Sequence, residues 1–335
     1  MRRLRGRGRR YARSCIGLAL GAGVLWLALR DLGWGDFWRV LAHIRWPWVI
    51  LAWLTVLCTS ATKTCRWKQL LRGNGRGGSW LSILAILSVG QLVNALLPGR
   101  FGELARAHLA RRESVSPFMV ALGTIVVEKV LDGLAALSLI AILALTMVLP
   151  QWFRSATVSF AGALLVLAIL VSAVTLGQRW LVRKCRRLPE RWRGPIEGGL
   201  QGIGILCQHG TLLPSAALTL LAWLLGASTN YLLFVALGLP TSTPAALLVL
   251  VTIHLGSLVP VVPGQLGLFH YLTVLALTVF GVSRQVSMPY ATVLYVLVYA
   301  SIIALGVGGL AWLSTDWHTL TRQLWTLPDR VNERQ

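Results

Sequence analysis

The chain contains 335 residues, of which 56% are hydrophobic and 13% are charged, and its mean hydropathy is +0.68. This apolar content excludes a soluble domain, because apolar stretches of about 20 residues, long enough to cross a bilayer, recur along the chain. The net charge of +21 comes from basic residues in the N-terminal arm and between the apolar stretches. This distribution is typical of the cytoplasmic loops of membrane proteins, so we expect no nucleic-acid partner.

The N-terminal segment consists of a basic arm, residues 1–13, and an apolar stretch at about 14–33. The arm is predicted to lie in the cytoplasm. Because Arg30 and Asp31 follow the apolar residues and no small-x-small cleavage site is present, we interpret this stretch as an uncleaved first span. The five cysteines show no metal-ligand spacing, and we expect no metal site, disulfide framework or cofactor.

A second span is predicted at about 47–64. It returns the chain to the cytoplasm and delivers a group of basic residues there, namely Lys63, Arg66, Lys68, Arg72 and Arg76. The basic linker at about 177–210 must lie on the same side of the membrane. The span before it, at about 156–176, therefore runs inward, and the long apolar segment at about 117–149 runs outward.

Residues 79–116 must then begin and end at the cytoplasmic side, which a single crossing does not permit. Pro98 and Gly99 interrupt this region, and a proline followed by a glycine breaks a helix. We therefore predict a re-entrant hairpin with its tip at these two residues. Non-helical backbone at that depth is tolerated where it is buried in protein or lines a wet cavity.

The second half of the chain repeats this pattern in the opposite direction. A span at about 211–238 runs outward, and residues 244–281 form a hairpin that enters from the outside. The last span, at about 289–313, returns to a short cytoplasmic tail, residues 314–335. The repeats therefore cover about 47–149 and 211–313 within one transmembrane domain, 14–335.

Two matching motifs mark the hairpin tips, Leu96-Leu97-Pro98-Gly99-Arg100-Phe101-Gly102 and Val261-Val262-Pro263-Gly264-Gln265-Leu266-Gly267. The residues that break the helices are Pro98, Gly99, Gly102, Pro263, Gly264 and Gly267. Together these features predict an all-α polytopic membrane protein with about six full spans plus two oppositely oriented re-entrant hairpins. These eight or more hydrophobic segments form an inverted repeat, an architecture that supports alternating access to a site at the midplane.

Charged residues follow the first break. A charge at the bilayer centre costs about 2.5–3.5 kcal/mol on insertion scales, so these side chains should face protein or water. Arg100, Glu103 and Arg106 recur every three residues, which places them on one face of the returning helix. Because Arg100 stands where a helix begins, its guanidinium and free backbone N–H groups favour an anion such as a phosphodiester.

A second charged group, Glu128, Lys129 and Asp132, lies on the next helix, near the inner edge of the hydrocarbon. The two groups together are the candidate lipid- and anion-binding residues. The alternative is an internal salt-bridge lattice that only holds the hairpin in place. Secondary candidates are Asn94, which can satisfy backbone groups freed by the first break, and Gln265 and His270 beside the second break.

The motifs resemble those of the lysylphosphatidylglycerol synthase transmembrane domain family, whose members are flippase-like integral membrane proteins. The resemblance covers most of the chain and rests on Arg66-Trp67, on the segment from Asn94 to Glu103 with Arg106, on Val127-Glu128-Lys129-Val130-Leu131-Asp132, and on the segment from Pro263 to Phe269. It adds Arg66 to the secondary candidates. Lys129 and His270 depart from the family, which usually has arginine and glutamate there, and we expect no aminoacyl-transferase domain.

These observations favour a lipid flippase or transporter that moves a phospholipid or a polyprenyl-phosphate-linked headgroup between leaflets. The alternative is a non-transporting lipid-binding scaffold, or an accessory partner of a membrane glycosyltransferase or lipid-modifying enzyme. The sequence contains no nucleophile elbow, metal-ligand cluster or phosphate-binding loop, so we do not expect an enzyme. The expected location is the bacterial cytoplasmic (inner) membrane, with both termini in the cytoplasm.

Overall fold

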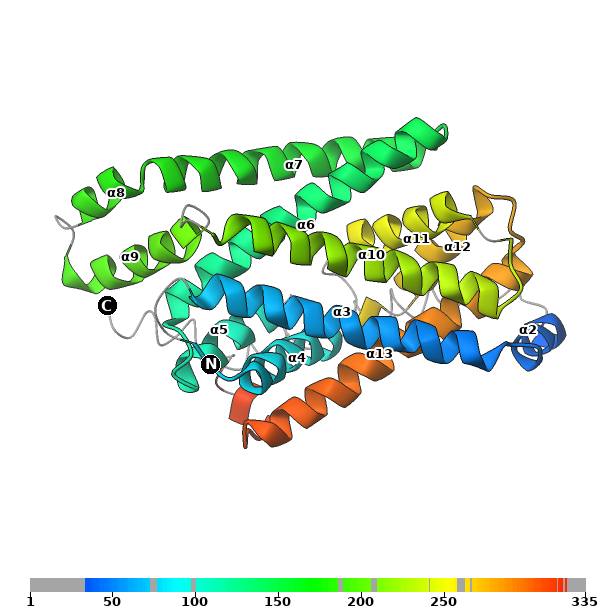
Figure 1. The fold of residues 1–335 in the computed structure, drawn as a ribbon, viewed down its shortest axis with the longest axis horizontal. Helices are drawn as coiled ribbons and strands as arrows, with labels where there is room; N and C mark the ends of the chain where they lie inside the picture. Colours follow the sequence, from blue (N-terminus) through cyan, green and yellow to red (C-terminus); the bar gives the residue numbers. More distant parts are fainter. Residues whose placement is uncertain are drawn as a thin grey trace, which may run out of the picture.

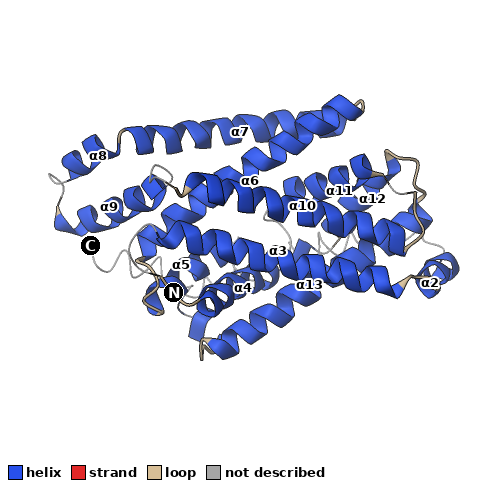
Figure 2. Cartoon of the chain, in the orientation of Figure 1, coloured by secondary structure: helices blue, strands red, loops and turns tan. Residues whose placement is uncertain are grey.

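The computed structural model describes residues 34–72, 77–97, 101–185, 189–205, 210–240, 242–257, 263–265, 267–317, 319–321 and 323. The predicted basic arm and first span lie outside these residues, as do Pro98, Gly99 and Arg100. All regular secondary structure in the described part is helical (Figure 2), which confirms the predicted all-α fold class.

The described residues form the following helices, given in chain order. They are α2 (Trp34–Ala42), α3 (Trp46–Arg72), α4 (Trp80–Leu96), α5 (Gly102–Arg112), α6 (Phe118–Thr146), α7 (Gln151–Leu176), α8 (Gln178–Cys185), α9 (Glu190–Gly204), α10 (Leu212–Ala236), α11 (Thr243–Gly256), the 3-10 turn η2 (Pro263–Gln265), α12 (Leu268–Thr278) and α13 (Arg284–Trp312).

Four helices, α3, α7, α10 and α13, are long and apolar enough to cross a membrane. Shorter apolar helices accompany them, namely α4, α11 and α12. These elements confirm a polytopic membrane protein. The total of about six full spans stays a prediction, because the first predicted span lies outside the described residues and α6, the predicted span at about 117–149, is not one of these four helices.

The two halves of the chain repeat one order of helix lengths. In the first half α3, α4, α5 and α6 have 27, 17, 11 and 29 residues. In the second half α10, α11, α12 and α13 have 25, 14, 11 and 29 residues. At 1.5 Å per residue the longer hairpin helix, α4, extends about 26 Å and α5 about 17 Å, so neither reaches across roughly 30 Å of hydrocarbon.

Each pair of short helices packs as an antiparallel hairpin. In the first, Asn94 contacts Gly102 near the tip, and Gly90, one turn back, lies against Arg106, one turn on. In the second, α11 packs against α12, where Gly256 adjoins Leu272. Both hairpins begin with a serine whose hydroxyl accepts a backbone N–H of the first turn, Ser79 in α4 and Ser242 in α11.

The two halves run in opposite directions. Helices α3 and α10 lie side by side and antiparallel, since Thr55 contacts Thr229 at 2.8 Å while Arg66, three turns on, contacts Thr219. Each hairpin packs against the last helix of the other half, α4 on α13 and α11 on α6. In Figure 1 the first hairpin starts at the end that holds α8 and α9, and the second starts at the end that holds α2. This is the arrangement of an inverted repeat.

The tip of the second hairpin meets the end of α4 inside the molecule. Turn η2 of the second tip packs on α4, where Gly264 adjoins the backbone oxygen of Ala95. Gly264 has φ +64°, a left-handed conformation that favours glycine. Two apolar cores flank the tips: one surrounds the first hairpin and includes Trp67, and the other joins the second hairpin to α6, α10 and α13.

Three predicted boundaries were wrong. Helix α3 continues to Arg72, eight residues past the predicted end of the span, so Arg66 lies inside a helix; the physical reason is that acidic residues of α6 compensate the charge of Arg66 within the protein. Helix α7 begins at Gln151, five residues before the predicted span. Helix α13 begins at Arg284 and contains Pro289, because the N-cap turn forms at Ser283.

The close approach of α4 and α5 predicts the effect of Gly102→Ala. A Cβ atom at this position would overlap the backbone oxygen of Gly90 and the side chain of Asn94. Such overpacking costs about 1–3 kcal/mol. We expect a lower thermal unfolding midpoint for the full chain purified in detergent. The matched variant Gly308→Ala meets no atom within 4 Å and should leave the midpoint unchanged or raise it. Equal midpoints for both variants would contradict the packing of this hairpin.

Candidate functional site

A buried carboxylate joins the first hairpin to the rest of the molecule. Glu128 of α6 accepts from Arg106 of α5, with Oε2 at 2.8 Å from Nη2 and Oε1 at 3.3 Å from Nη1. The same Oε1 lies 3.1 Å from Nη2 of Arg66 on α3. The Arg66, Arg106 and Glu128 side chains are 0%, 8% and 7% exposed, so one carboxylate compensates parts of two buried guanidinium charges.

Asp132, one turn beyond Glu128, completes the pairing of Arg66. Its two oxygens accept from the two terminal nitrogens of Arg66 at 2.6 and 3.1 Å, a bidentate arrangement. Arg66 also donates to the hydroxyl of Thr219 on α10 at 3.0 Å. This residue therefore ties α3 to both α6 and α10.

The side chain of Arg106 has an aromatic neighbour as well. Its guanidinium carbon lies 4.3 Å from the centre of the Trp67 ring, a cation–π contact. The indole N–H of Trp67 donates to Thr124 of α6 at 3.2 Å. Because Trp67 is fully buried, its ring is held in place and fixes the position of the Arg106 guanidinium.

A second charge pair, Lys129 and Glu103, is more exposed than this buried network. Lys129 Nζ is 3.4 Å from Oε1 of Glu103, and the two side chains are 44% and 20% exposed. Asn94 donates to Oε2 of Glu103 at 3.3 Å and accepts from the backbone N–H of Gly102 at 2.7 Å. The predicted contact of Asn94 with backbone freed by the first break is therefore confirmed.

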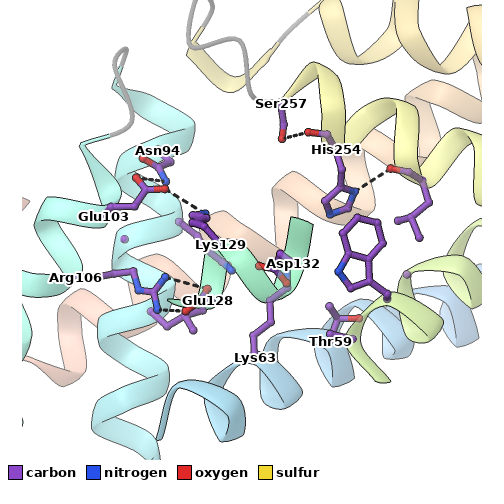
Figure 3. Close-up of a pocket in the computed structure, with 17 residues that line it drawn as sticks. Thr59, Lys63, Asn94, Glu103, Arg106, Glu128, Lys129, Asp132, His254 and Ser257 are labelled. Atoms are coloured by element: carbon purple, nitrogen blue, oxygen red, sulfur yellow. Dashed lines mark hydrogen bonds and ion pairs between the residues drawn. The ribbon is translucent and has the colours of Figure 1, made fainter. Parts of the chain in front are cut away.

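These charged groups line one side of a cavity of about 280 Å³ between the two halves of the protein. The opposite side includes Trp223 and Gly226 of α10 and His254 of α11, and the ring centres of Trp223 and His254 lie 4.5 Å apart. Figure 3 shows the ionic group on one side, His254 on the other, and Lys63 of α3 between them. We call this space the ionic chamber.

The predicted site residues have different positions relative to this chamber. The residues that line it are Asn94, Glu103, Arg106, Glu128, Lys129 and Asp132. Arg66 lies behind them and supports the wall. Arg100 lies outside the described residues. Their role in binding stays a prediction, and the salt-bridge lattice that we considered as the alternative is present in the Arg66, Arg106, Glu128 and Asp132 group.

The residues near the second break divide between two environments. Gln265 lines an adjoining cavity, described below, whereas His270 is buried beside Phe269 and Tyr295 and lines neither cavity. The hydroxyl of Tyr295 donates to the backbone oxygen of Gly264 at 3.1 Å and so holds the second tip against α13. Among the described residues, no group of three or more His, Cys, Asp or Glu side chains could hold a metal ion.

Two residues that line the ionic chamber, Lys63 and His254, were not among the predicted site residues. Lys63 was placed at the end of the predicted span at about 47–64, among the basic residues that this span delivers to the cytoplasm. Its place three residues before Arg66, within one helical turn, was the signal that could have found it. His254 gave no sequence signal beyond being a single histidine in an apolar helix.

The fold and the chamber define a polytopic membrane protein that holds a charged cavity at the meeting point of two re-entrant hairpins. Residues 14–306 match the family described as Lysylphosphatidylglycerol synthase TM region, and the chain belongs to this family. The match confirms the resemblance noted above; no aminoacyl-transferase domain is evident in the chain.

Two curated relatives are similar to this chain, both of them UPF0104 membrane proteins. The one from Methanothermobacter thermautotrophicus is 23% identical over 327 residues, which cover 91% of this chain and 96% of the relative. The one from Methanocaldococcus jannaschii is 29% identical over 96 residues, a local match that covers 28% of this chain and 29% of the relative. No solved structure matches the chain.

The buried network predicts a stability effect for Glu128→Gln. The substitution removes the charge that compensates Arg66 and Arg106 and leaves two buried cations under-compensated. Breaking a buried ion pair in this way costs about 3–5 kcal/mol. We expect a large fall in the unfolding midpoint or in the yield of monodisperse protein in detergent. Glu113→Gln is the control, because Glu113 and its partner Arg112 are partly exposed and 3.8 Å apart, and this change should have little effect. A fully stable Glu128→Gln protein would contradict the network.

Proposed function

We propose that this protein moves lipid headgroups between the two leaflets of a membrane, with the ionic chamber as the polar part of the path. The substrate class is a phospholipid or a polyprenyl-phosphate-linked lipid. The observation that carries the proposal is the charged cavity at the point where two hairpins from opposite ends of the molecule meet. Family membership agrees with a role connected with membrane lipids.

The physical reason is the cost of moving a charged headgroup through hydrocarbon. A single charge at the bilayer centre costs about 2.5–3.5 kcal/mol on insertion scales. The ionic chamber replaces hydrocarbon with fixed charges and hydrogen-bonding groups from α3, α5, α6 and α11. A headgroup in the chamber therefore exchanges water for protein partners, which lowers the barrier to crossing.

The inverted repeat supplies a route to both leaflets. The two halves present the same helix order in opposite directions. If they rock against each other, the chamber can open first toward one leaflet and then toward the other. The end that carries α8 and α9 is rich in basic residues, including Arg183, Lys184 and Arg193, and we propose that it faces the cytoplasm. Its location in a bacterial cytoplasmic membrane stays a prediction.

The proposal is tested by leaflet exchange of a fluorescent phosphatidylglycerol in proteoliposomes that contain the purified full chain, with a parallel assay for a polyprenyl phosphate. Exchange well above that of empty liposomes supports translocation. No exchange of either lipid would overturn the proposal in favour of a lipid-binding scaffold. Chemical conversion of the lipid on incubation would point instead to an enzyme.

The chamber predicts transport defects that are separate from folding defects. Glu103→Gln and Lys129→Gln alter a partly exposed ion pair, which costs the fold only about 0–1 kcal/mol. We expect these variants to unfold like wild type but to exchange lipid at least about tenfold more slowly, because a headgroup loses a charged partner.

Arg193→Gln is the matched control for this pair. Arg193 is 43% exposed, pairs with Glu197 at 3.0 Å on α9, and does not line the ionic chamber. Its exchange rate should equal that of wild type. Wild-type exchange in all three variants would place the transport path elsewhere.

A further inference from the structure

A second cavity of about 240 Å³ adjoins the ionic chamber. The two cavities share a boundary formed by α3, α4, α10 and α11, with Lys63, Gln91 and His254 among the residues that line both. Beyond this boundary the second cavity is bordered by apolar and aromatic side chains, including Phe269 of α12 and Leu294, Val298, Tyr299 and Ile302 of α13, together with polar side chains such as Asn230 and Gln265. We call it the aromatic chamber.

The charges around the ionic chamber do not balance. Four cations, Lys63, Arg66, Arg106 and Lys129, face three anions, Glu103, Glu128 and Asp132. All three anions contact cations other than Lys63, since Glu103 pairs with Lys129, and Glu128 and Asp132 pair with arginines. Within the described residues, Lys63 has no hydrogen bond or ion pair.

A cation in this position calls for an anionic partner. Lys63 lies within the membrane-spanning helix α3, where an uncompensated charge is costly. An ammonium group with three N–H donors suits a phosphate, which offers several acceptor oxygens on one centre.

We propose that Lys63 binds the phosphate of a lipid whose headgroup occupies the ionic chamber and whose tail enters the aromatic chamber. This proposal deepens the proposed translocation function and rests on it. The boundary position of Lys63 matches the chemistry of a phospholipid or a polyprenyl phosphate, in which the phosphate is the junction between the polar and the apolar part. The Glu103–Lys129 pair then lies on the headgroup side, and Tyr299 lies on the tail side.

The test measures equilibrium binding to the full chain in detergent, by native mass spectrometry, without any transport step. The probes are dioleoylphosphatidylglycerol, a polyprenyl phosphate, dioleoylglycerol, which lacks the phosphate, and glycerol 3-phosphate, which lacks the tail. We expect Lys63→Gln to weaken binding of a phosphate lipid at least about tenfold, the loss of one charge-assisted contact. Lys63→Arg should restore most of the affinity.

The control is Lys68→Gln, because Lys68 lies on the same helix and lines neither chamber. It should bind the phosphate lipids as wild type does. Dioleoylglycerol should bind more weakly than phosphatidylglycerol to wild type, and Lys63→Gln should remove this difference.

The tail is tested with Val298→Trp, which fills the aromatic chamber, and Val296→Trp, which adds the same ring at a 55% exposed position of α13. Only Val298→Trp should weaken lipid binding at least about tenfold, by excluding apolar contacts from the chamber. Glycerol 3-phosphate should bind both variants equally.

Three outcomes would overturn this inference: phosphate lipids binding Lys63→Gln as tightly as wild type, glycerol 3-phosphate binding wild type as tightly as the lipids, or no binding of either phosphate lipid. These outcomes are distinct from failure of the transport proposal. Lipid exchange by wild type together with Lys63-independent binding rejects only the phosphate site. Lys63-dependent binding without exchange rejects only translocation.

Discussion

The architecture depends on the pairing of Glu128 with two buried arginines. Glu128 stands on α6, Arg66 on α3 and Arg106 on α5, so one carboxylate sets the positions of three helices. Charges in a low-dielectric interior must be compensated, and separating α5 from α6 would leave Arg106 without its carboxylate. The hairpin helix α5 is too short to be anchored by spanning the bilayer, and this ion pair supplies the anchor.

Close backbone packing complements the ionic anchor. Gly102 lies against the backbone of Gly90 within the hairpin, and Gly306 and Gly309 of α13 lie against α4. In a membrane, helices gain little from excluding lipid, so close contact between small residues supplies much of the packing energy. The first hairpin is therefore held by charge on the side of α6 and by close packing on the side of α13.

The sequence predicted the long helices and both hairpins, because hydropathy and the count of basic segments constrain how often a chain crosses the membrane. It did not predict α2, α8 or α9, which lie outside the predicted spans and hairpins. It also predicted six of the chamber residues, since Glu103 and Arg106 follow a helix break and Glu128 and Asp132 share a helix face. It did not predict Lys63 as a chamber residue, because the basic residues at the end of this span were interpreted as cytoplasmic, and the spacing of Lys63 from Arg66 does not show which distant residues the lysine faces. The contact of His254 with Trp223 likewise depends on how α11 and α10 pack, which is a tertiary property.

The inverted repeat is symmetric in its backbone and asymmetric in its chemistry. The first half supplies all the charged side chains of the ionic chamber, and the second half supplies His254, Trp223 and the aromatic side chains beside η2. A site that held only a small ion would need no such difference between its two sides. An amphipathic ligand does need it, because its charged and apolar parts require opposite surroundings at a fixed separation. The position of Lys63 where these surroundings meet follows from the antiparallel contact of α3 with α10, so the same packing that relates the two halves also gives the cavity its polarity.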